Sequence, residues 1–155
     1  MSYYLLLKFA HVIGATVLLG TGAGIAFFML LAHRTGDAKI IAGVTRIVVI
    51  ADFVFTASAA VVQPITGALL ANFGGYTLFS GWIGISLVLY LVTGAFWLPV
   101  VWMQVRMRAL AEAAVRDGTV LPPLYYRLFH TWFAFGFPAF AAVIGIIWLM
   151  ITKPG

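Results

Sequence analysis

Four long apolar stretches, separated by short polar or glycine-rich links, dominate this sequence of 155 residues. They run from about 3 to 32, 46 to 72, 77 to 105 and 124 to 152, the second with an interfacial lead-in from Ala38. A bilayer core about 30 Å thick is crossed by about 20 apolar residues in a helix. Backbone groups in lipid must be satisfied within their own segment, so each stretch predicts a helix. The expected fold is all-α, an integral membrane four-helix bundle.

The composition excludes several other classes of protein. Only 8% of the residues are charged, whereas soluble domains carry about a quarter. The chain is therefore expected to form a single transmembrane domain over residues 1–155, with the lipid bilayer as its surroundings. The absence of cysteine excludes disulfides, thiolate metal sites and iron–sulfur clusters. The basic residues flank helices as topology signals do, so nucleic acid is not an expected partner. A second copy of the chain and a membrane redox partner are the protein partners that the sequence leaves open.

The basic residues predict how the chain is oriented in its membrane. The first and third links and their flanks hold Arg34, Lys39, Arg46, Arg106, Arg108, Arg116 and Arg127. The other side holds only Lys8 and Lys153. Because Lys and Arg accumulate in cytoplasmic loops, these two links should be cytoplasmic and both termini non-cytoplasmic. The expected location is the bacterial cytoplasmic (inner) membrane, with multiple spans.

Polar residues inside the apolar stretches are the candidates for a functional site, because they are costly in lipid and usually face the bundle interior. Depths counted at about 1.5 Å per residue sort them into two clusters. The outer cluster contains His11, Gln63, Ser86 and Tyr90. The inner cluster contains Asp52, His130, Arg127 and Gln104.

Each cluster also has a purely structural interpretation. Gln63 and Ser86 are residue types that form hydrogen bonds between membrane helices. Asp52 would equally suit a salt bridge with Arg127 or Arg46, because an unpaired carboxylate in hydrocarbon is costly. His11 has no acidic residue near it in sequence, so a ligand or proton role and a packing role both remain open.

Four segments carry a resemblance to a known family. They are Leu7-Lys8-Phe9-Ala10-His11, Met29-Leu30-Leu31-Ala32-His33-Arg34, Gln63-Pro64-Ile65-Thr66-Gly67 and Trp97-Leu98-Pro99-Val100-Val101-Trp102. The pattern resembles a bacterial family of predicted four-helix integral membrane proteins of unknown function. More distantly, the first helix is similar to that of the HemJ-type protoporphyrinogen oxidase and of CopD-like membrane proteins. The resemblance to the HemJ type implies a b-type haem bound through His11.

Three functions follow as hypotheses, and the sequence does not decide whether the chain is an enzyme. The first is a haem b-binding or redox-associated membrane protein, with His11 as ligand of the haem iron and Gln63 or Tyr90 as hydrogen-bond donors around it. His130 lies roughly 9 Å from the depth of His11, so ligation by a single histidine of the chain is expected. The second is a small transporter or metal- or proton-handling permease component that uses Asp52 and His130 as a relay. The third is a membrane anchor or assembly subunit without chemistry.

Overall fold

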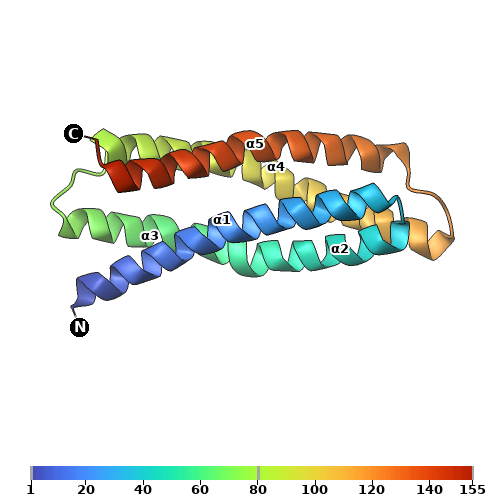
Figure 1. Cartoon of the computed structure of the whole chain (residues 1–155), viewed down its shortest axis with the longest axis horizontal. Helices are drawn as coiled ribbons and strands as arrows, with labels where there is room; N and C mark the ends of the chain where they lie inside the picture. Colours follow the sequence, from blue (N-terminus) through green and yellow to red (C-terminus); the bar gives the residue numbers. More distant parts are fainter. Residues whose placement is uncertain (1, 80, 155) are drawn as a thin grey trace.

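The computed structural model describes residues 2–79 and 81–154, and it shows a bundle of long helices (Figure 1). The elements are α1 (Tyr3–Thr35), α2 (Ala38–Ala51), a π-helical turn η1 (Asp52–Thr56), α3 (Ala57–Phe73), α4 (Gly81–Asp117) and α5 (Pro123–Thr152). Because α2, η1 and α3 are continuous, the described residues form four helices that are long and apolar enough to cross a membrane. The all-α four-helix membrane fold predicted from the sequence is confirmed.

The helix boundaries have local causes in the sequence. Gly36 ends α1 in the left-handed conformation at φ 66°, where glycine avoids the strain of a Cβ atom. The Asp37 side chain then accepts hydrogen bonds from the backbone N–H groups of Lys39 and Ile40 and caps the start of α2. This cap explains why the second membrane helix starts at Ala38, eight residues before the apolar stretch proper.

The other boundaries follow the same logic. The third membrane helix continues past its apolar stretch as a basic extension to Asp117, and it ends before Gly118, which has φ 64°. Pro122 precedes the first turn of α5 and Pro123 occupies it, where the missing N–H of proline costs nothing.

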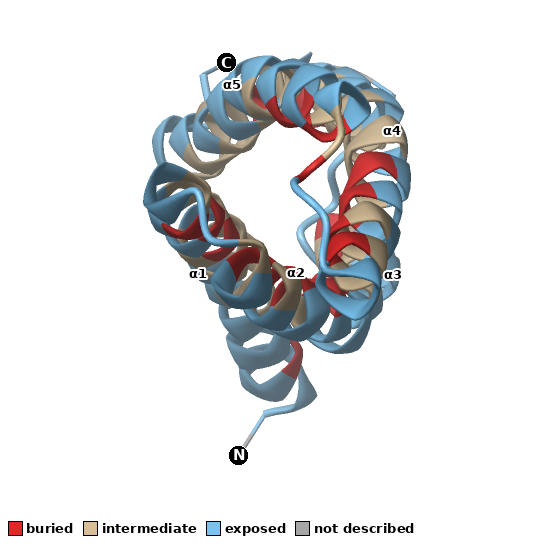
Figure 2. Cartoon of the chain, turned by 90° about the vertical axis from the view of Figure 1, so that its right-hand side faces the viewer, coloured by how far each residue is buried: buried red, intermediate tan, exposed pale blue. Residues whose placement is uncertain are grey.

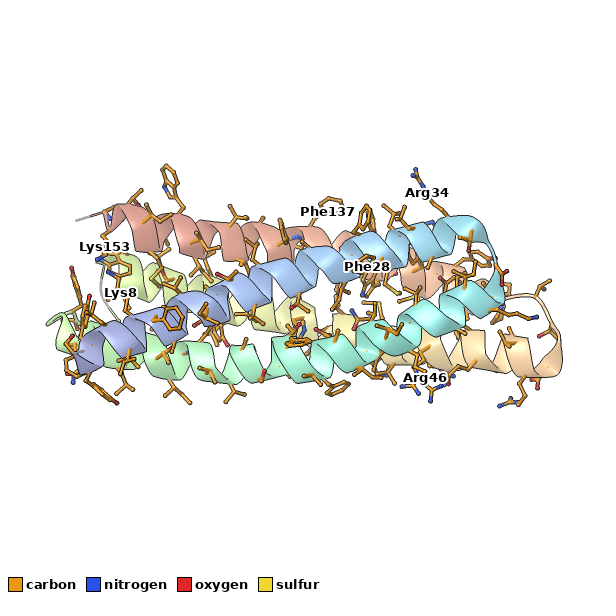
Figure 3. The ribbon with its side chains drawn as sticks, turned by 60° about the horizontal axis from the view of Figure 1, so that its bottom comes forward. Lys8, Phe28, Arg34, Arg46, Phe137 and Lys153 are labelled. Carbon is orange, nitrogen blue, oxygen red and sulfur yellow. The ribbon has the colours of Figure 1, made fainter. Side chains whose placement is uncertain are left out.

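The two ends of the bundle differ in charge. Both chain termini and the α3–α4 link lie at one end, which we call the terminal end, and the α1–α2 and α4–α5 links lie at the other, the arginine end (Figure 1). Lys8 and Lys153 lie toward the terminal end, whereas Arg34 and Arg46 lie toward the arginine end (Figure 3). Which end faces the cytoplasm stays a prediction from this charge difference.

The main cluster of buried apolar side chains among the described residues fills the half of the bundle next to the arginine end. Its buried members come from α1, α2, α4, α5 and the α4–α5 link: Ile25, Met29, Ala32, Ile41, Val48, Met103, Met107, Ala111, Ala114, Leu121, Tyr125, Phe129 and Trp132. Viewed along the bundle, the buried residues face the inside of a ring of helices (Figure 2). In the terminal half, α1 packs on α3 and α4 packs on α5. The space between these two pairs holds the candidate site.

Candidate functional site

A cavity of about 1610 Å³ lies in the terminal half of the bundle and reaches inward to its middle. It is lined by residues of α1, η1, α3, α4 and α5, mainly with apolar side chains. Ligand sites are typically apolar cavities of about 300–1000 Å³ with a few placed polar groups, so this cavity has room for a large ligand. The outer cluster predicted from the sequence lines it in full: His11, Gln63, Ser86 and Tyr90.

His11 is held in place by a residue that the sequence analysis did not select. Its Nδ1 atom lies 2.8 Å from the Thr66 hydroxyl of α3. With the single hydroxyl proton of Thr66 donated to the carbonyl of Val62, at 2.9 Å, the hydroxyl oxygen is the acceptor for His11 Nδ1, and this direction is an assignment from the hydrogen-bond pattern. Nδ1 then carries the hydrogen and Nε2 keeps a free lone pair, as in metal-binding histidines whose other nitrogen is hydrogen-bonded. Thr66 lies three residues after Gln63 on the polar stripe of its helix, and that spacing was the signal for it.

Two glycines allow α1 and α3 to approach each other at this point. A Cβ atom on Gly67 would lie 3.2 Å from Cε1 of His11, and one on Gly14 would lie 3.0 Å from Oε1 of Gln63. The imidazole of α1 therefore rests on the backbone of α3, and the amide of α3 rests on the backbone of α1. Gln63 is buried, and its Oε1 atom has no hydrogen-bond partner among the described residues.

The other two members of the outer cluster make hydrogen bonds that are structural. The Tyr90 hydroxyl donates to the Ala60 carbonyl and joins α4 to α3 across the cavity wall. The Ser86 hydroxyl donates to the Trp82 carbonyl of its own helix at 2.8 Å. Tyr90 and Ser86 thus shape the wall, and the partner of His11 is Thr66.

The inner end of the cavity holds the carboxylate of Asp52, which accepts hydrogen bonds from side chains of α4. Asp52 Oδ1 accepts from the Trp97 indole N–H at 3.3 Å. The Gln104 amide, oriented by its two partners, donates to Asp52 Oδ2 at 3.0 Å and accepts from the Trp132 indole N–H at 3.2 Å. All four side chains, those of Asp52, Trp97, Gln104 and Trp132, line the cavity. Asp52 also begins the π-helical turn, in which the N–H of Ala57 bonds to the Asp52 carbonyl, and such turns recur at functional sites.

Of the three residues predicted to lie with Asp52 in the inner cluster, only Gln104 contacts it. His130 and Arg127 are exposed, and neither forms an ion pair with Asp52 among the described residues. The reason lies in the face of α5 that turns inward, which carries Phe129 and Trp132. His130 follows Phe129 by one residue and is turned from it by about 100°. Its Nδ1 atom lies 2.7 Å from the carbonyl of Tyr126.

The remaining histidine belongs to the core of the arginine half. The His33 ring stacks on Phe129 with 3.6 Å between ring centroids, and its Nδ1 atom lies 3.4 Å from the Tyr125 hydroxyl. Neither His33 nor His130 lines the cavity. Within residues 2–79 and 81–154, no three His, Asp or Glu side chains come together as a metal-binding group. His11 is therefore the only histidine of the described chain with access to the cavity.

A family model with the description "Predicted integral membrane protein (DUF2269)" matches residues 5–154. The chain belongs to this family. The DUF2269 description supports a multi-pass integral membrane protein, in agreement with the four membrane-length helices. Comparison with curated proteins and with solved structures gave no match. The chemistry of this DUF2269 protein therefore has to be argued from its cavity.

Proposed function

We propose that this DUF2269 protein binds haem b in the cavity of its terminal half, and that Nε2 of His11 would be the single iron ligand from the chain. The observation that carries the proposal is the hydrogen bond of 2.8 Å between His11 Nδ1 and Thr66. It fixes the ring at the cavity wall, and in the tautomer with Nδ1 as the hydrogen-bond donor it leaves Nε2 free to bind iron. A neutral imidazole so held is the usual protein ligand of haem iron.

The cavity fits a flat, mostly apolar macrocycle. Its volume of about 1610 Å³ exceeds that of common small-ligand sites. Small residues, among them Ala15, Gly67 and Gly94, form part of the lining beside the larger side chains. Haem sites in helical bundles are built in this way, from side chains on facing helices around a core space.

The residues of the chain would have separate tasks in this site. His11 would bind the iron, and Thr66 would set the direction and basicity of its ring through the second nitrogen. The apolar walls would surround the ring, and a low polarity around a bound haem influences its reduction potential. Bound haem would supply one-electron chemistry, which is the role that the sequence resemblance of the first helix to HemJ-type and CopD-like proteins implies.

An absorption spectrum of purified protein from haem-replete cells tests the proposal. Wild type should show a Soret band that shifts on reduction with dithionite, and His11→Ala should lose it. His130→Ala is the matched control, because this histidine is exposed and outside the cavity, and it should keep the full band. A colourless wild type, or equal loss of the band in both variants, would refute the proposal and favour the anchor hypothesis.

The transporter hypothesis gains no support from the geometry. The relay that it requires would join Asp52 to His130, and these residues face different directions. Asp52 instead contacts Trp97 and Gln104, which are neutral hydrogen-bond donors.

A further inference from the structure

The terminal end of the cavity is lined by two lysines from different helices. Lys8 comes from α1 and Lys153 from the end of α5, and both lie toward the same end of the bundle (Figure 3). Lys8 precedes His11 by three residues, so the two side chains share one face of α1. A positive charge thus lies one helical turn from the proposed iron ligand, on the side away from the middle of the membrane.

No acidic side chain of the protein lies at this end to neutralise the lysines. The four acidic residues are Asp37, Asp52, Glu112 and Asp117. Asp37 caps α2 at the arginine end, and Asp52 lies at the inner end of the cavity. Glu112 and Asp117 form ion pairs with the nearby Arg108 and Arg116. Among the described residues, no acidic side chain therefore competes with a ligand for Lys8 and Lys153 at the terminal end of the cavity.

The local structure keeps both lysines at the terminal end of the cavity. The Lys8 ammonium lies over the Tyr4 ring, 5.9 Å from its centroid, a favourable contact for a cation. Lys153 ends α5 in the left-handed conformation at φ 43°, and its N–H bonds to the Leu149 carbonyl. Many helices end with a residue in this conformation, and here it places Lys153 directly after the last turn of α5.

We infer that the ligand of this cavity carries carboxylates at one edge of an apolar body, and that Lys8 and Lys153 bind those carboxylates. The inference rests on the proposed function and extends it. Haem b and its iron-free precursor, protoporphyrin, share this chemistry, because both carry two propionates on one edge of the ring. The carboxylate edge would lie at the polar boundary of the membrane, and the ring would extend inward past His11.

Binding of metal-free protoporphyrin IX and of its dimethyl ester separates this inference from iron ligation. Both probes are titrated into the detergent-purified full chain and followed by porphyrin fluorescence. The diacid should bind wild type about tenfold more tightly than the ester, since two exposed ion pairs are lost on esterification. Lys8→Gln with Lys153→Gln should remove this preference, and Lys39→Gln at the arginine end should retain it.

The outcomes distinguish the two proposals. His11→Ala should keep the preference for the diacid, because no iron is present, while it loses the Soret band of haem. Haemin, the iron-bearing probe, should require both His11 and the lysines. Equal binding of diacid and ester to wild type would overturn the inference and leave the lysines as interfacial anchors. An equal effect of Lys39→Gln and the double substitution would overturn it as well.

Discussion

Replacement of Gly67 by alanine tests the close approach of α1 and α3 that positions His11. The added Cβ atom would lie 3.2 Å from His11 Cε1 and 3.9 Å from Nδ1. Ordinary contacts of a Cβ atom begin near 3.4 Å, so the ring or the helix must move by a few tenths of an ångström. The His11 ring cannot move freely, because its Nδ1 atom is hydrogen-bonded to Thr66. Thr66 is the residue directly before Gly67 in α3.

The size of the effect follows from two opposing terms. Overpacking of a tight contact costs about 1–3 kcal/mol, whereas alanine is favoured over glycine inside a helix by up to about 1 kcal/mol. Gly67→Ala should therefore lower the free energy of unfolding by about 0–2 kcal/mol. Gly20→Ala is the matched control, because a Cβ atom on Gly20 meets nothing within 4 Å, and it should be neutral or stabilising by up to about 1 kcal/mol.

Reversible unfolding in mixed detergent micelles, followed by circular dichroism, measures this difference. Gly67→Ala should be less stable than Gly20→Ala by about 1–3 kcal/mol. It should also weaken any binding that depends on the direction of the His11 ring. If Gly67→Ala is as stable as Gly20→Ala, α1 and α3 are not in close contact at His11, and the argument for a fixed imidazole fails.

Three further predictions address the other parts of the structure. Thr66→Val should lower haem affinity about 10- to 100-fold with little change in the circular dichroism spectrum. The control Thr66→Ser should retain binding. Unchanged affinity in the valine variant would show that the hydroxyl has no role. Asp52→Ala should destabilise the bundle by about 2–4 kcal/mol in thermal unfolding, because the buried Gln104 amide loses its acceptor; wild-type stability would contradict a paired Asp52. A cysteine at Thr35 should react with an impermeant thiol reagent only from the cytoplasm, and one at Gly74 only from outside, in a chain without native cysteine; the reverse pattern would invert the predicted orientation.

The helices were predictable from the sequence because membrane spanning is a matter of length and apolar composition. The outer cluster was predictable as well, because polar residues at a shared depth in the membrane tend to face the bundle interior, and Thr66 lies three residues from Gln63 on the same face of its helix. That face was expected to turn inward, since its residues are polar.

The partners of Asp52 were harder to predict. Depth alone paired it with His130, and depth does not specify which face of α5 turns inward. The buried apolar residues Phe129 and Trp132 mark that face. Because most residues of α5 are apolar, the spacing of these two does not distinguish the inward face from the lipid-facing one. The cavity was not predictable either, because it depends on the distance between helix pairs and not on the pattern of any single helix.

The packed half and the hollow half of the bundle lie at different depths in the membrane, and they place different requirements on the sequence. Substitutions in the core around Met107 and Phe129 would change whether the four helices assemble at all. Substitutions in the walls of the cavity would change what it accepts, while the assembly stays intact. A chain built in this way can acquire a new ligand by drift at one end of the membrane, without first having to evolve a new way to fold.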